Sequence, residues 1–229
     1  SNISWKEDEE FEKKIGYLFD GLYSDYSYIW FNKSLATGGG EHASSAEVVL
    51  TIVLRDILLL KCEINPTEGR KILEQFLTNE YRFPLFKRFV LLCIDKHWSE
   101  YSEFLIKLLE TYSDALNDSD LEVELYDVVL HHNAQFDSSV ITKIQELLND
   151  VPEYYVKKGE NLVAYWKYQW LSALRNHQEF SSLYEETKNK AGLKEDKPYT
   201  PDRETMKGGW ATHKSPLSKQ ELLEKPVPE

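Results

Sequence analysis

The clearest chemical feature of this 229-residue sequence is a concentration of carboxylates between residues 113 and 150. Nine acidic residues lie there against one base, Lys143, so this segment carries a net charge of −8 within a chain total of −12. A surface of this kind attracts basic partners and repels a phosphate backbone. The acids are Asp114, Asp118, Asp120, Glu122, Glu124, Asp127, Asp137, Glu146 and Asp150.

We predict a partner-binding face within this segment. On a helix, the spacing of Asp120, Glu124 and Asp127 (i, i+4 and i+7) places all three on one side, and we expect them to point outward together. A simply solvated acidic face is the alternative, and the sequence leaves it open. The candidate partner-binding residues are Asp118, Asp120, Glu124 and Asp127.

Histidine and cysteine offer weaker candidates. His131 and His132 are adjacent, so on a helix their side chains diverge by about 100° and do not easily hold one ion. We interpret them as charges that complement the C-terminal end of a helix. Cys93 and His97 stand at i and i+4, but apolar neighbours favour a buried structural thiol over a reactive pair.

Motifs for cofactor chemistry are absent from the sequence. The glycines at 38–40 lack the Lys-Ser/Thr that follows a phosphate-binding loop, and there is no His-Glu-x-x-His motif. The two cysteines, Cys62 and Cys93, do not have zinc spacing. We therefore predict no catalytic residue, no metal site and no cofactor.

The composition is that of a soluble cytoplasmic protein. Apolar residues make up 41% and charged residues 29% of the chain. No apolar run approaches the roughly 20 residues of a membrane span, and no signal peptide is visible in the sequence. Two thiols inside apolar runs are typical of a reducing compartment; a bridge between them would need neighbouring helices and oxidising conditions.

Helical periodicity dominates the chain and strand signals are nearly absent, so we predict an all-α fold of about ten helices. Asn65-Pro66 and Asp137 mark helix starts, and we also expect caps at Ser99 and at Asp118 or Ser119. The predicted helices lie at about 6–23, 26–31, 45–63 and 161–174, and the others begin near residues 66, 84, 99, 118, 137 and 178.

Eight of these helices fall into pairs that repeat every 33 to 43 residues or so, the range of two-helix solenoid units. We predict an irregular HEAT/TPR-like stack (an α-solenoid), with a plain bundle as the alternative. The predicted organisation is N-terminal helices at 1–36, four helix-pair repeats at 45–191 and an extended tail at 192–229. Four apolar anchors favour a tail that straps the helices over a free linker: Tyr199, Met206, Trp210 and Leu217.

Two stretches resemble a known class of proteins. The segment from Leu73 through Phe83-Pro84 to Leu91 is similar to a repeat unit of very large bacterial proteins, and Trp170–Leu193 with Ser215–Leu223 looks like the close of such a region. The proteins in question are STAND-type NTPases, some of them implicated in defence against phage. The resemblance implies a sensor or scaffold region. It supplies no catalytic residue, because the nucleotide-binding motifs are missing here.

These features predict a non-enzymatic interaction, sensor or scaffold module. We expect it to be part of a longer chain, since the sequence starts at Ser1 and its single methionine is Met206. Its partner would be another protein or another part of the same parent chain, with nucleic acid disfavoured by the charge and no role for a membrane. The alternative from another class is an accessory domain of a nucleic-acid-processing enzyme. The sequence leaves the oligomeric state open.

Overall fold

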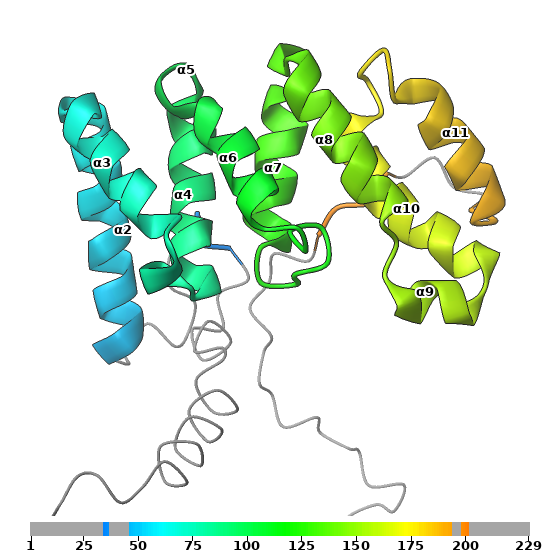
Figure 1. The fold of residues 1–229 in the computed structure, drawn as a ribbon, viewed down its shortest axis with the longest axis horizontal. Coiled ribbons are helices and arrows are strands. Elements are labelled where there is room, and N and C mark those ends of the chain that lie inside the picture. Colours follow the sequence, from blue (N-terminus) through cyan, green and yellow to red (C-terminus); the bar gives the residue numbers. More distant parts are fainter. Residues whose placement is uncertain (1–33, 37–45, 194–197, 202–229) are drawn as a thin grey trace, which may run out of the picture.

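A computed structural model describes residues 34–36, 46–193 and 198–201. Within these ranges the protein is all-helical and has no strand, as the sequence predicts (Figure 1). The helices predicted at 6–23 and 26–31 lie outside the described residues, as do Met206, Trp210 and Leu217 of the tail.

Within the described ranges, ten α-helices follow one another with short connections. Two of them are very short: α5, which the sequence predicts only as part of the helix from 99, and α9, which the sequence does not predict. The helices are α2 (Ala46–Ile64), α3 (Pro66–Phe76), α4 (Pro84–Lys96), α5 (Trp98–Tyr101), α6 (Glu103–Thr111), α7 (Glu122–His132), α8 (Ser138–Asn149), α9 (Glu153–Lys158), α10 (Glu160–Leu174) and α11 (Ser181–Lys190).

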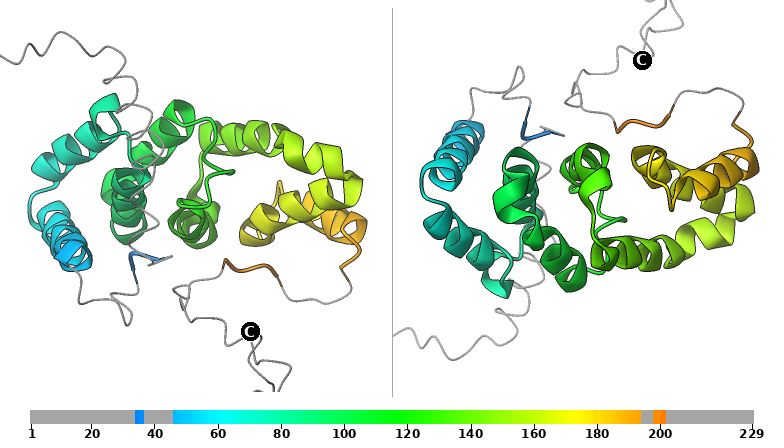
Figure 2. Two further views of the ribbon diagram at one scale, coloured as in Figure 1. Left: turned by 90° about the horizontal axis from the view of Figure 1, so that it is seen from below. Right: turned by 90° about the horizontal axis from the view of Figure 1, so that it is seen from above.

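The helices form two rows. Helices α2, α4, α7 and α10 contact one another in succession, and α6 packs on α8 in the other row. Figure 2 shows both rows end-on, with two short non-helical segments, 34–36 and 198–201, on the outer side of the α2–α4–α7–α10 row. The core lies between the rows, and central helices such as α7 have neighbours on most sides.

Two predicted helix starts are confirmed. The Asn65 side chain accepts a hydrogen bond from Glu68 N before α3, and Asp137 Oδ1 accepts from Ser139 N (2.9 Å) and Val140 N (3.0 Å) before α8. Each bond satisfies an amide that has no partner within its helix.

Two other predicted caps are wrong. Helix α5 begins at Trp98 and includes Ser99. Helix α7 begins only at Glu122, because Asp118 is used in a turn in which its Oδ1 accepts from Asp120 N at 2.8 Å.

The two cysteines meet in the core between α2 and α4. Both are free thiols and both are buried. Their mutual hydrogen bond, together with burial, raises the pKa of Cys93 far above its usual range. Gly69 of α3 faces the same junction, where a Cβ would collide with the Tyr101 hydroxyl, which itself donates to Cys62 O at 2.8 Å. Cys93 is thus a packed core thiol, as the sequence favoured.

The described part of the tail contacts the helices. Tyr199 N–H donates to Ser172 Oγ of α10 (3.1 Å), and the Tyr126 hydroxyl of α7 donates to Tyr199 O (2.5 Å). The Tyr199 hydroxyl in turn bonds Glu122. Tyr199 is therefore an anchor, as predicted.

Candidate partner-binding site

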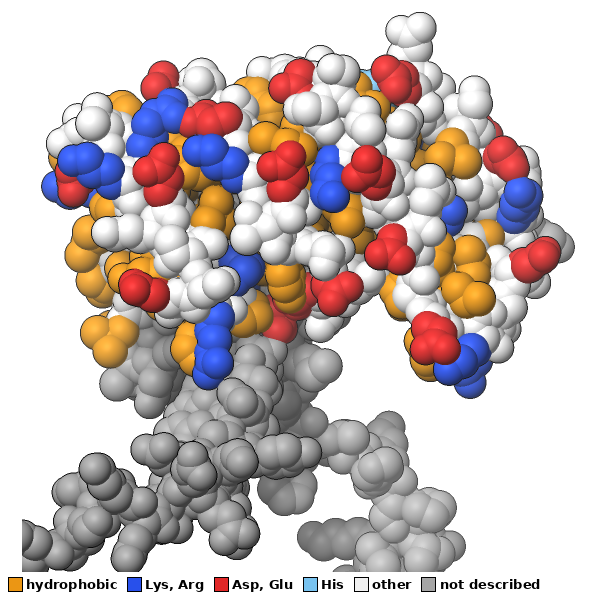
Figure 3. Space-filling view, viewed as in Figure 1, with side chains coloured by type: hydrophobic (Ala, Val, Ile, Leu, Met, Phe, Trp, Pro, Cys, Tyr) orange, Lys and Arg blue, Asp and Glu red, His pale blue; other side chains and the backbone are white. Residues whose placement is uncertain are grey.

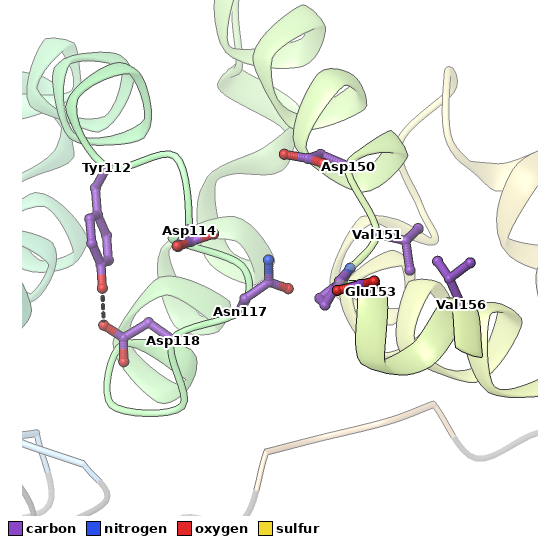
Figure 4. Close-up of a pocket in the computed structure, with 9 residues that line it drawn as sticks. Tyr112, Asp114, Asn117, Asp118, Asp150, Val151, Glu153 and Val156 are labelled. Atoms are coloured by element: carbon purple, nitrogen blue, oxygen red, sulfur yellow. Dashed lines mark hydrogen bonds between the residues drawn. The ribbon is translucent and has the colours of Figure 1, made fainter. Parts of the chain in front are cut away.

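An open pocket of about 610 Å³ lies where the loop between α6 and α7 meets the corner between α8 and α9. Figure 4 shows four carboxylates around it, from both chain segments. The described lining contains no lysine, arginine or histidine. It consists of Tyr112, Asp114, Asn117, Asp118, Asp150, Val151, Pro152, Glu153 and Val156.

The loop side of the pocket is fixed by the core beneath it. Ala115 and Leu116 are buried, and the Trp170 indole N–H of α10 donates to Leu116 O at 3.0 Å. Turns close the loop, since Asp114 O accepts from Asn117 N (2.8 Å) and Asp118 N (3.0 Å). The acidic side chains therefore project from a held loop.

Tyr112 is the aromatic wall of the pocket. Its hydroxyl donates to Asp118 Oδ2 at 2.5 Å, and burial together with this carboxylate raises the pKa of the phenol. The Lys87 ammonium lies 5.4 Å from the centre of the Tyr112 ring and donates to Arg82 O at 3.0 Å. Burial lowers the pKa of Lys87, an effect that the Asp118 charge partly offsets. Asp118 is thereby held in place, while Asp114, Asp150 and Glu153 are exposed.

The predicted outward face of α7 is wrong. Glu124 is buried and forms an ion pair with the equally buried Arg88 of α4, with Arg88 Nε 2.9 Å from Glu124 Oε2. Its Oε1 also accepts from Leu35 N at 2.6 Å. Asp127 is buried as well. These two carboxylates belong to the core and are not available to a partner.

The correction has a simple physical reason. Asp120 precedes α7 and lies in the turn that Asp118 closes, so it is not on that helix, while Glu124 is on the side of α7 that turns toward α4. Helix α7 carries apolar residues on all sides, a pattern that predicts burial on all sides. A carboxylate on such a helix needs an internal partner, and the only arginine of α4, Arg88, supplies it.

Of the candidate residues, only Asp118 lines the pocket. Asp120 is half-buried next to it and Glu124 and Asp127 are internal. Asp114 and Asp150 were noted as part of the acidic segment but not chosen, and Tyr112, Asn117 and Glu153 were missed. The sequence could have indicated the pocket in part. Its acidic residues stand in or next to the connections on either side of the α7–α8 pair, where acidic side chains reach solvent.

The two histidines lie in the last turn of α7, as predicted, and contact α4. His131 Nδ1 is 2.7 Å from Asp95 Oδ1, and His132 Nε2 is 3.1 Å from Asp95 O. His132 also stacks on Trp98, with ring centroids 4.5 Å apart. Burial alone would raise the pKa of Asp95, but hydrogen bonds from His131 and Lys96 outweigh it and leave that pKa below its usual value.

Two absences hold for the part of the chain that the structure describes. No group of three or more His, Cys, Asp or Glu side chains there is placed to hold a metal ion. No helix in the same ranges combines the length and the apolar character needed to cross a membrane.

Comparison with known proteins adds no relative: no family model, no curated protein and no solved structure matches this chain.

Proposed function

We propose that this protein is a non-enzymatic helical-repeat module, of irregular HEAT/TPR type, that binds a basic segment of a protein partner at the acidic pocket. The observation that carries the proposal is the lining itself: four carboxylates and no described base around one concave surface. A cleft with charge of one sign concentrates the opposite charge.

The pocket also suits the shape of a basic side chain. Lysine and arginine combine an aliphatic stem with a charged head. Tyr112, Val151 and Val156 offer apolar surface to the stem, and Asp114 and Asp150 offer carboxylates to the head (Figure 4). The repeat assignment is supported by the two rows, in which each helix of one row contacts the next.

The proposal can be tested by replacing two aspartates of the pocket with asparagine, which has nearly the same shape but no charge. Asp114→Asn with Asp150→Asn removes two charges at exposed positions that make no structural side-chain bond in the described contacts. Binding of a fluorescent peptide of alternating lysine and alanine, measured by anisotropy at low salt, should weaken roughly fivefold, as expected for the loss of two exposed charge contacts.

A matched control separates the pocket from the overall charge. Glu80→Gln with Glu110→Gln changes the net charge equally at exposed positions outside the pocket. Its peptide affinity should stay close to that of the parent protein. Equal weakening in both variants, or none in either, contradicts a pocket-specific site.

The alternative, a nucleic-acid accessory domain, would use α9, where the exposed Tyr154 lies under the Lys158 ammonium. This helix borders the acidic pocket, and Figure 3 shows acidic and basic side chains interspersed over the visible face, with no basic patch. A labelled single-stranded oligonucleotide in the same assay should therefore not bind. The context of a STAND-type NTPase is likewise a proposal, which rests on the sequence resemblance alone.

A further inference from the structure

Helix α2, at one end of the described rows, exposes a continuous apolar stripe. Its most exposed members alternate in spacing by three and four residues, the spacing of the contact positions in a coiled coil. Figure 3 shows apolar side chains gathered at this end of the molecule. The stripe consists of Leu50 (67% exposed), Val53 (47%), Ile57 (57%), Leu60 (55%) and Ile64 (68%).

The opposite face of α2 is already used. Leu58 and Cys62 are buried against α3 and α4, and Arg55 donates to Leu35 O at 2.8 Å. A helix that is apolar on two opposite faces is a helix packed on both sides. An end helix of a repeat stack ordinarily presents a polar outer face. The stripe therefore has the character of a helix–helix interface, but no described segment of the chain covers it.

We propose that residues 6–23 of this same chain cover the stripe as a helix antiparallel to α2. These residues lie outside the described ranges, and the argument rests on their sequence. Their apolar residues repeat with the same alternation of four and three, at Phe11, Ile15, Leu18 and Leu22. Both segments are about 27 Å long as helices.

One antiparallel register pairs each of these four apolar positions with a member of the stripe. It sets Phe11 opposite Ile64 and Leu22 opposite Val53. The same register also pairs the two apolar residues in between, Ile15 with Leu60 and Leu18 with Ile57.

The flanking charges favour this register over others. Residues beside the apolar seam set the orientation of paired helices. Here Lys61 comes opposite Glu12 and Glu63 opposite Lys14, so both pairs attract. Reversing the direction would set Lys61 against Lys14 and Glu63 against Glu12. Two copies of α2 packed antiparallel would bring Asp56 against Glu63.

The chain can make the connection. Leu35 is held beside Arg55, near the middle of α2, by the bond described above. Ten residues lie between positions 23 and 34, and even with the predicted helix at 26–31 they can span roughly 27 Å. This exceeds the path around a helix about 10 Å across.

A designed cross-link tests the register in the full chain. Ile15→Cys with Leu60→Cys should oxidise to an intramolecular disulfide, seen as a monomer band of shifted mobility on a non-reducing gel, because disulfide geometry tolerates only close neighbours. In the matched control, Lys13→Cys with Leu60→Cys, position 13 lies on the far side of the predicted helix and should not cross-link. The native thiols, Cys62 and Cys93, are buried and do not compete.

Each other outcome overturns the proposal. Cross-linked dimers of Leu60→Cys alone would show that a second copy covers α2. Equal cross-linking of the control would refute the register, and no cross-linking would refute the contact.

A charge-reversal cycle gives a second readout. Lys61→Glu and Glu12→Lys should each lower the melting temperature, and the double variant should restore it. Glu10→Lys in place of Glu12→Lys should give no rescue. Rescue by both, or by neither, also counts against the register.

Discussion

At the scale of single residues, the most consequential feature is the buried ion pair of Arg88 and Glu124. Each side chain is only 3% exposed. Glu124 accepts two hydrogen bonds from the guanidinium and one from the backbone of Leu35. An intact buried pair of this kind stabilises the fold only weakly. Removing one partner destabilises the fold strongly, because the remaining partner is then a desolvated charge without a counter-ion.

Glu124→Ala should therefore destabilise the protein by about 3 kcal/mol, as breaking a buried pair generally does. The measurement is the free energy of unfolding from urea denaturation. Glu110→Ala, at an exposed carboxylate of α6, serves as the control and should change it by less than about 0.5 kcal/mol. Equal losses in the two variants would show that the pair has no special role.

At the scale of elements, α4 and α7 are joined a second time, at their C-terminal ends. Asp95 of α4 faces His131, His132 and Lys96, and its side chain is only 7% exposed. The pKa of Asp95 is lowered in the folded protein. Its contribution to stability is therefore present above the unfolded-state pKa near 3.8 and is lost as the pH falls through the folded-state value.

This linkage gives a prediction for Asp95→Asn. The parent protein should be more stable than the variant at about pH 6, and the difference should shrink as the pH is lowered below 3.8 and the folded-state aspartate gains its proton. Unfolding midpoints in urea across this range provide the measurement. A difference that stays constant with pH would show that the contribution of Asp95 does not depend on its charge.

Element types could be predicted from the sequence because apolar periodicity is a local property. The bounds of α2 and the starts of α3 and α4 agree with prediction to within about a residue, and two caps were identified by their side chains. The short helix α5 was not distinguished from α6 and α9 was not predicted, because a helix of one or two turns is too short to show apolar periodicity.

The candidate site could be predicted only in outline, because the direction of a helix face depends on its neighbours. The acidic segment does contribute three carboxylates to the pocket. Nothing local to α7 reveals that Arg88, 36 residues earlier, turns Glu124 inward. The pocket also needs two connections to meet, and their meeting depends on the packing of α6 against α8.

At the scale of the whole molecule, two extended segments cross the outer side of the same helix row (Figure 2). Residues 34–36 bridge α2 and α7 through Arg55 and Glu124. Residues 198–201 bridge α7 and α10 through Tyr126 and Ser172. Helices of the row are thereby tied by segments distant from them in sequence, which resists their separation.

The contribution of the second tie can be isolated by two truncations. A chain that ends at Pro201 keeps the described anchor, whereas one that ends at Leu193 loses it. The longer chain should melt close to the full-length protein. The shorter chain should melt several degrees lower, because it loses the three hydrogen bonds of Tyr199 and the Tyr126–Tyr199 ring contact (centroids 5.9 Å apart), worth about 3 kcal/mol together.

Tyr199→Phe in the full chain refines this result. It removes only the hydroxyl bond to Glu122 and should lower the melting temperature by less than the shorter truncation does. If the chains ending at 193 and 201 melt together, and both below the full-length protein, the stabilising contact lies beyond residue 201 and the role of Tyr199 is refuted. If all three melt together, the tail is a linker that stabilises nothing, and the row of helices is held by its own side chains alone.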